Sequence, residues 1–310
     1  MPLPSLGTAF DRLFTGAVAA WIYAWLRIGT AAIFLVRNTD WLRNVAPLEH
    51  HRFVRGLLFF DSTAAEPRLI SPMIPGLTLD AGTSRALVYT RTVLAVLLLL
   101  GVRARASAAL LALVSFSLFA ADRYRYYHHL YLLYLTVAWL ALTPIGAALS
   151  LEQPIRRALA AFRPEMIPRR SSWLAAEPVW PLQLVRALVI GVYFAAGVSK
   201  LDAGFLAGDA LRELERFHVL KGTFWELTRD AVGYGGAATL SCFTEFALCA
   251  GLLLRPTRRV AVVFGWAFHA GISASMPVYT FGAQMSVLLL VFWPRAQPAF
   301  SRTDGLRSRH

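Results

Sequence analysis

Repeated apolar runs of bilayer length constrain the fold of this chain more than any other feature. The sequence has 310 residues, of which 57% are hydrophobic, and its mean hydropathy is +0.52. Soluble domains are typically about 45–50% apolar, and an apolar run of about 20 residues is long enough to cross a bilayer as a helix. The sequence therefore predicts an all-α fold, that of a polytopic helical membrane protein.

The apolar runs predict about eight transmembrane helices. Their expected ranges are residues 14–36, 86–101, 106–121, 128–149, 179–201, 231–254, 259–275 and 279–293. Nothing in the sequence marks a second, soluble domain. We therefore expect one transmembrane domain over residues 1–295, followed by a short basic cytoplasmic tail over residues 296–310.

The basic residues predict the orientation of the chain and its main partner. The formal net charge is +13, and the arginines gather at helix ends and in short loops. Because Lys and Arg in short loops favour the cytoplasmic side, we expect both termini in the cytoplasm, most simply at a bacterial inner membrane. Membrane orientation accounts for this charge better than phosphate binding does. The lipid bilayer is the expected partner, and nucleic acid is not.

The segment 205–230 has an amphipathic pattern. Leu211, Leu214, Phe217 and Leu220 recur at helical spacing, and charged residues occupy the other side. This pattern is typical of a helix that lies in the membrane interface. We expect an interfacial amphipathic helix across the outer surface.

One lysine lies at membrane depth. The chain has two lysines against twenty-nine arginines, and Lys200 closes the apolar run 179–201. Lysine can lose its proton in a low-dielectric site, whereas arginine cannot. Ionisable groups inside transmembrane segments are functional candidates by default. The competing interpretation is that Lys200 extends its charged end to the outer interface.

Other ionisable side chains are expected near Lys200, in the outer half of the membrane. Tyr193 and Gly197 share its helix face. The remaining predicted helices contribute His128, His129, His269, Glu245 and Arg91. Such convergence is the pattern expected of a buried catalytic or ligand chamber. Structural interpretations also apply: an aromatic belt around the histidine pair, a core contact for His269, and an ion pair of Glu245 with Arg27, Arg91 or Arg186.

Three segments resemble a known family. The run YFAAGVSKLD, residues 193–202, is similar to the active-site segment of vitamin K-dependent γ-glutamyl carboxylases and of the wider horizontally transferred transmembrane (HTTM) domain family. HHLYLLYL, residues 128–135, resembles the family's histidine before an aromatic-rich helix start. FHAGISASMPVYTFGAQM, residues 268–285, resembles its Phe-His segment followed by a Phe-Gly step. The resemblance covers most of the chain.

The resemblance implies an integral membrane enzyme that uses a reduced quinone. In that family a lysine is the base toward vitamin K hydroquinone, which implies that Lys200 is the base and that His129 helps to hold the oxygenated intermediate. A lysine can serve in this way if burial keeps its amine neutral. Further residues expected to contact the quinone are Tyr193, Phe194, Gly197, His269, Arg91, Glu245 and Trp266.

The implied cofactor is reduced vitamin K or a menaquinol-type quinone, with O2 and CO2 as co-substrates. The deprotonated hydroquinone reacts with O2, the resulting alkoxide removes a proton from a C–H bond, the carbanion captures CO2, and the quinone leaves as its epoxide. The acceptor is a peptide or a small molecule. The carboxylases carry a large extracytoplasmic region after this domain and this sequence has a short tail, so propeptide docking is not expected.

Two other functions are compatible with the sequence. One is a non-catalytic membrane partner in the maturation of, or immunity to, secreted peptide toxins. The other is a metal-dependent oxidoreductase built on His128, His129, His269 and Glu245. No two of these histidines are spaced i, i+4 and no metal motif is present, so no metal is expected.

Overall fold

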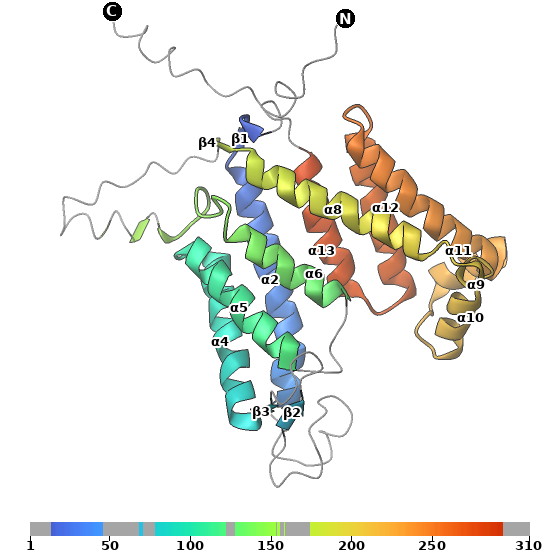
Figure 1. Cartoon of the computed structure of the whole chain (residues 1–310), viewed down its shortest axis with the longest axis horizontal. Coiled ribbons are helices and arrows are strands. Elements are labelled where there is room, and N and C mark those ends of the chain that lie inside the picture. Colours follow the sequence, from blue (N-terminus) through green and yellow to red (C-terminus); the bar gives the residue numbers. More distant parts are fainter. Residues whose placement is uncertain are drawn as a thin grey trace, which may run out of the picture. The chain divides into compact units, whose positions relative to one another are not determined.

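The computed structural model describes residues 14–45, 68–70, 78–121, 128–152, 154–155, 158 and 174–293 (Figure 1). These residues fall into two compact units, one within Met1–Ile22 and Ala176–His310 and the other within Tyr23–Ala175. The described part of the chain is mostly helical. The predicted basic tail, residues 296–310, lies outside the described residues.

The described residues of the unit within Tyr23–Ala175 form four helices and a small sheet. Its elements are α2 (Trp21–Val45, from Tyr23 onward), β2 (Arg68–Ile70), β3 (Thr78–Asp80), α4 (Ala81–Leu100), α5 (Ala104–Ala121) and α6 (His128–Leu140). Helix α5 packs against both α4 and α6, as Figure 1 shows. Helix α2 contributes Phe34, whose ring lies 5.7 Å from that of Tyr134 on α6.

A buried arginine binds the segment that follows α6. Arg27 on α2 is fully buried, and it donates hydrogen bonds to the carbonyl oxygens of Ile145 (3.0 Å), Ala148 (3.4 Å) and Leu149. The prediction carried this helix to residue 149, but α6 ends at Leu140, because Pro144 disfavours helical backbone in the residue before it. Arg27 satisfies carbonyl oxygens of the segment that follows α6.

The other unit contains α11, the longest helix among the described residues. Its elements are β1 (Ala17–Ala19), β4 (Ala176–Pro178), α8 (Trp180–Ser199), α9 (Ala203–Leu206), α10 (Asp209–Arg216), α11 (Thr223–Leu253), α12 (Arg258–Ser275), α13 (Tyr279–Leu289) and the 3-10 turn η3 (Leu290–Phe292). Helix α11 packs against both α8 and α12, and α12 packs against α13. Figure 1 shows α8 and α11 running side by side over much of their length.

Helices occur at all eight predicted positions, but fewer have the length and apolar character of a membrane span. Among the described residues, three do: Gly82–Leu100, Trp180–Ser199 and Thr223–Leu253. Shorter apolar helices cover Ala104–Ala120, Leu130–Leu140 and Thr280–Phe292. The prediction of a helical membrane protein is confirmed at this coarser level, and the number of eight spans stays a prediction.

Two short two-stranded sheets accompany the helices. Strand β1 pairs antiparallel with β4, with Val18 opposite Glu177, and β2 pairs with β3, with Leu69 opposite Leu79. Because residues 17–19 are held in a strand, the helix at the first predicted span, α2, begins at Trp21, whereas the prediction began this span at residue 14.

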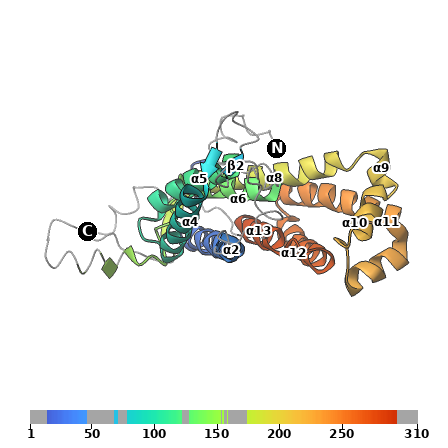
Figure 2. The same ribbon diagram turned by 90° about the horizontal axis from the view of Figure 1, so that it is seen from below.

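The amphipathic segment 205–230 is not a single helix. It divides into the end of α9, α10 and the beginning of α11, because Gly208 (φ 85°), His218 (φ 55°) and Gly222 (φ 94°) adopt left-handed or otherwise positive-φ backbone. Leu211 and Leu214 pack onto the cluster Leu220, Trp225 and Ala237, whereas Phe217 is exposed. Figure 2 shows α9 and α10 beside one end of α11. The apolar face of α10 is thus used against its own unit, and placement in a membrane interface remains a prediction.

Candidate functional site

Lys200 forms an ion pair with Glu245. Lys200 directly follows α8, and its backbone N–H donates to the carbonyl of Gly197 (3.1 Å). Its ammonium Nζ donates to Oε1 of Glu245, which lies in the middle of α11. The side chains are 23% and 8% exposed, respectively. Lys200 therefore has a protein partner, and within this unit Glu245 pairs with it instead of with Arg186.

A glycine lets α11 approach α8 beside this pair. At Gly197 a Cβ atom would lie 3.0 Å from the ring of Phe246 on α11, closer than most real contacts. The thiol of Cys242 donates to the carbonyl of Gly197 at 3.5 Å. Small residues allow helix backbones to come close in membrane proteins. Gly197 thus acts through helix packing, which brings Glu245 within reach of Lys200.

Tyr193 and His269 form a second polar pair in the same unit. The Tyr193 hydroxyl lies 2.7 Å from Nε2 of His269 on α12, and each residue is 2% exposed. The rings of Phe268 and Phe281 lie 5.4 Å and 5.6 Å from the imidazole. This hydrogen bond fixes the ring orientation inside an aromatic enclosure.

The two pairs belong to one cluster. Both pairs join the α8 segment to a neighbouring helix, through Glu245 on α11 and His269 on α12, and α11 packs against both α8 and α12. Two buried atoms of the cluster, Oε2 of Glu245 and Nδ1 of His269, have no hydrogen-bond partner among the described residues. Buried polar atoms rarely lack partners. These two can therefore receive hydrogen bonds from, or donate them to, a bound molecule.

Phe205 of α9 completes the surroundings of Lys200. The Lys200 Nζ lies 5.9 Å from the centre of its ring, a distance suited to a cation–π contact. Asp202 caps α9 by accepting from the Phe205 backbone N–H at 3.1 Å. Phe205 was not among the predicted site residues. Asp is a common N-cap residue, so Asp202 could have indicated a helix that begins just after Lys200 and contains Phe205.

Comparison with known proteins assigns the chain to a family. A model of the HTTM domain matches residues 72–296, more than half of the chain. The chain belongs to the HTTM domain family. This match confirms the resemblance read from the lysine segment, and it makes the chain a membrane protein of the vitamin K-dependent carboxylase-like family. No curated protein and no solved structure matches the chain.

Two predicted quinone-contacting residues of this HTTM protein face elsewhere in the same unit. Phe194 is 55% exposed, and its ring meets that of Phe246 edge-on at 6.3 Å. Trp266 donates from Nε1 to the carbonyl of Ser286 (3.0 Å) and stacks on Trp293 at 6.0 Å. A shallow apolar groove of about 510 Å³ lies on α12 near this stack, lined by Arg259, Val260, Val263, Phe264, Ala267 and Trp293. None of the four residues of the polar cluster lines this groove.

Two other predicted site residues belong to the unit within Tyr23–Ala175. Arg91 on α4 is buried, and its Nη1 donates to the Tyr134 hydroxyl at 3.4 Å. His129 lies in the first turn of α6, and its side chain and that of His128 are outside the described residues. Within the described part of the chain, no three His, Cys, Asp or Glu residues lie close enough together to hold a metal ion.

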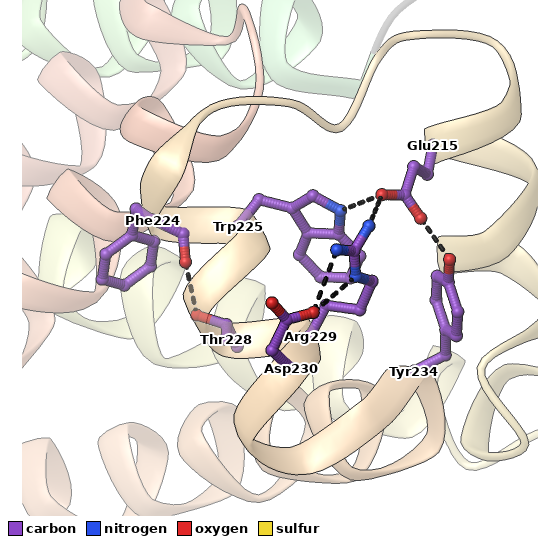
Figure 3. A network of polar contacts seen from close by, with 7 residues as sticks. All are labelled: Glu215, Phe224, Trp225, Thr228, Arg229, Asp230 and Tyr234. Atoms are coloured by element: carbon purple, nitrogen blue, oxygen red, sulfur yellow. Dashed lines mark hydrogen bonds and ion pairs between the residues drawn. The ribbon is translucent and has the colours of Figure 1, made fainter.

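A polar network of the HTTM protein near the start of α11 was missed by the sequence analysis (Figure 3). Glu215 of α10 accepts hydrogen bonds from Trp225 Nε1 (3.0 Å), Arg229 Nη1 (2.6 Å) and the Tyr234 hydroxyl. The Tyr234 hydrogen bond is the largest of the effects that lower the pKa of Glu215 below its ordinary value. Because the partners lie 10 to 19 residues from Glu215 in the sequence, no short motif indicated this network.

Proposed function

We propose that this HTTM protein is an integral membrane enzyme in which Lys200 is the base toward a reduced quinone, coupled through O2 to removal of a C–H proton from an acceptor. The supporting observation is the position of Lys200 at the end of α8, paired with Glu245 within the matched domain. Proton transfer to such a positioned side chain is the usual form of general base catalysis. With CO2 as co-substrate, the acceptor is carboxylated.

The residues around Lys200 fit a hydroquinone. Phe205 offers an aromatic face, and Glu245 Oε2 and His269 Nδ1 offer buried polar atoms for the hydroxyl groups. When bound, the hydroquinone supplies the reaction with O2 that generates a base stronger than any side chain. The chain's own residues hold and move protons: Lys200 Nζ accepts one, and the Tyr193–His269 hydrogen bond keeps the imidazole oriented.

The remaining parts of the proposal come from the family resemblance. His129 is proposed to help hold the oxygenated cofactor, Arg91 to stabilise developing negative charge, and Phe194 and Trp266 to contact the quinone or its side chain. The cofactor is of the vitamin K or menaquinol type, and the acceptor is a peptide or a small molecule. We place the protein in a bacterial inner membrane as one domain, residues 1–295, with cytoplasmic termini and the site in the outer half.

Quinol turnover with matched lysine variants tests this function. Purified protein in nanodiscs is supplied with vitamin K hydroquinone or menaquinol and O2, and the epoxide is followed by chromatography. We expect epoxide from the wild type and none from Lys200→Ala or Lys200→Arg, although arginine keeps the positive charge and can bond to Glu245. Size-exclusion chromatography and circular dichroism show whether each variant is folded.

The same variants address the non-catalytic alternative. A purely structural ion pair would have the same geometry as the Lys200–Glu245 pair. A protein that only assists in secreted-peptide maturation or immunity would need a positive charge and hydrogen bonding at position 200, but no group that can lose a proton. Absence of epoxide from folded wild-type protein would contradict the enzymatic proposal. Retained peptide maturation or immunity in Lys200→Arg would then favour the partner function.

A further inference from the structure

We infer that Lys200 and Glu245 act together as one base, in which Glu245 holds the proton that Lys200 must release before it can accept another. The inference rests on the proposed function, because it concerns the same proton transfer. It assigns Glu245 a role beyond that of a counter-ion, and it starts from the way the two side chains are exposed and bonded.

The first step concerns the lysine. In the ion pair Nζ is an ammonium group, and an ammonium group cannot act as a base. Sequence reasoning expected burial alone to keep the amine neutral, but the Lys200 side chain is 23% exposed and has a carboxylate bonded to it. The proton must therefore be given a place to go within the site.

The second step concerns the carboxylate. Glu245 is the more buried partner, at 8% exposed, and its Oε2 has no hydrogen-bond partner among the residues that the structure describes. If the proton of Lys200 left for solvent, a buried carboxylate would remain without its cation, at a cost of several kcal/mol. Transfer from Nζ to Oε1 along the existing hydrogen bond leaves a neutral amine beside a neutral carboxylic acid.

The third step closes the proton balance. The neutral Nζ accepts the proton of a bound hydroxyl, so that the pair carries one net positive charge beside one ionised hydroxyl. No proton leaves the site, and no oxidant is used in this step. The other titratable groups of the cluster are Tyr193 on α8 and His269 on α12. They are hydrogen-bonded to each other, and neither is bonded to the ammonium group.

A non-reacting probe tests the pair without turnover. 4-Methoxy-1-naphthol has one ionisable hydroxyl, and its absorption spectrum reports whether that hydroxyl is ionised. Bound anaerobically to protein in nanodiscs at neutral pH, it should be ionised in the wild type and un-ionised in Lys200→Met and Glu245→Gln. Glu226→Gln, an exposed position in the first turn of the same helix, is the matched control and should behave as the wild type.

Infrared difference spectra taken on probe binding provide a second readout. A protonated carboxyl band should appear in the wild type and be missing from Glu245→Gln. In turnover at neutral pH, Glu245→Gln should lower kcat about 10²- to 10⁴-fold, the usual contribution of general acid–base catalysis, with KM unchanged, and activity should recover at higher pH, where the lysine loses its proton to solvent.

The opposite results are equally specific. An ionised probe in Glu245→Gln, or activity in that variant moved to lower pH, would show that Glu245 is only a counter-ion that restrains the lysine, and the inference would be overturned. Failure of wild-type protein to bind the probe or form epoxide would instead overturn the proposed function and the inference with it.

Discussion

At the scale of single residues, the polar cluster consists of side chains that the sequence indicated. The sequence did not indicate which of them form pairs. Tyr193, Lys200 and His269 were predicted from motif and helix face, and all three lie in the cluster. The pairing of Lys200 with Glu245 was not predictable, because it joins residues 45 apart on two helices whose relative rotation no local pattern specifies. Helix periodicity fixes which face a residue occupies but not which neighbour that face meets.

The Tyr193–His269 hydrogen bond should contribute measurably to stability. Tyr193→Phe removes the hydroxyl and leaves Nε2 of a buried imidazole without its partner, which costs about 1–3 kcal/mol. We expect a lower thermal unfolding midpoint in nanodiscs. Tyr89→Phe, at a residue that is 54% exposed, is the matched control and should leave the midpoint unchanged. Equal midpoints for the two variants would mean that the hydrogen bond is not formed.

At the scale of elements, apolar runs located the helices well and their ends poorly. Positions of helices follow from hydrophobic content, which the sequence states directly. The ends of helices depend on local features for which the sequence gives only weak signals. Examples are the three-residue strand at Ala17–Ala19 and the buried Arg27, which bonds carbonyls after α6. A third is the bend at Gly233 (φ 69°), which lets α11 begin at Thr223. The amphipathic stripe of α10 was recognised, but its burial against Trp225 was not.

The Glu215 network makes the attachment of α10 dependent on pH. Because the pKa of Glu215 is lowered in the folded protein, its stabilising effect is complete above the ordinary glutamate value of about 4.3 and is lost as pH falls through the lower folded-state value. We expect amide exchange of α10, corrected for intrinsic rates, to accelerate below about pH 4.

Glu215→Gln should accelerate this exchange already at neutral pH and remove the further acceleration in acid. Glu213→Gln, on the same helix and 54% exposed, keeps the network and is the control. A wild-type acid response that survives in Glu215→Gln would assign the attachment to other contacts, such as the packing of Leu211 and Leu214.

At the scale of the whole molecule, the sequence indicated the family and the membrane character. The orientation of the chain across the membrane is predicted only from the distribution of its basic residues. The two cysteines, Cys242 and Cys249, are buried, so a new surface cysteine can be labelled against a low background. If the termini are cytoplasmic, α10 lies outside and the turn between α11 and α12 lies inside.

Glu213→Cys should therefore react with a membrane-impermeant maleimide on intact cells, and Thr257→Cys should react only after lysis. Both positions are exposed, so accessibility to the reagent reports the side of the membrane. The reversed pattern would place the termini outside and the Lys200 site in the inner half.

The Lys200–Glu245 pair also bears on how the chain enters the bilayer during synthesis. Each charge alone disfavours insertion of its helix; a lysine at the centre of a segment costs about 2.5–3.5 kcal/mol on the insertion scale, and less toward its end. Lys200 ends α8, and Glu245 lies in α11, the next long apolar helix. If the translocon released α8 first, the ammonium group of Lys200 would enter the membrane before Glu245 had been synthesised and would lack its partner. The two helices consequently gain by leaving the translocon together, as a hairpin whose charges are already neutralised.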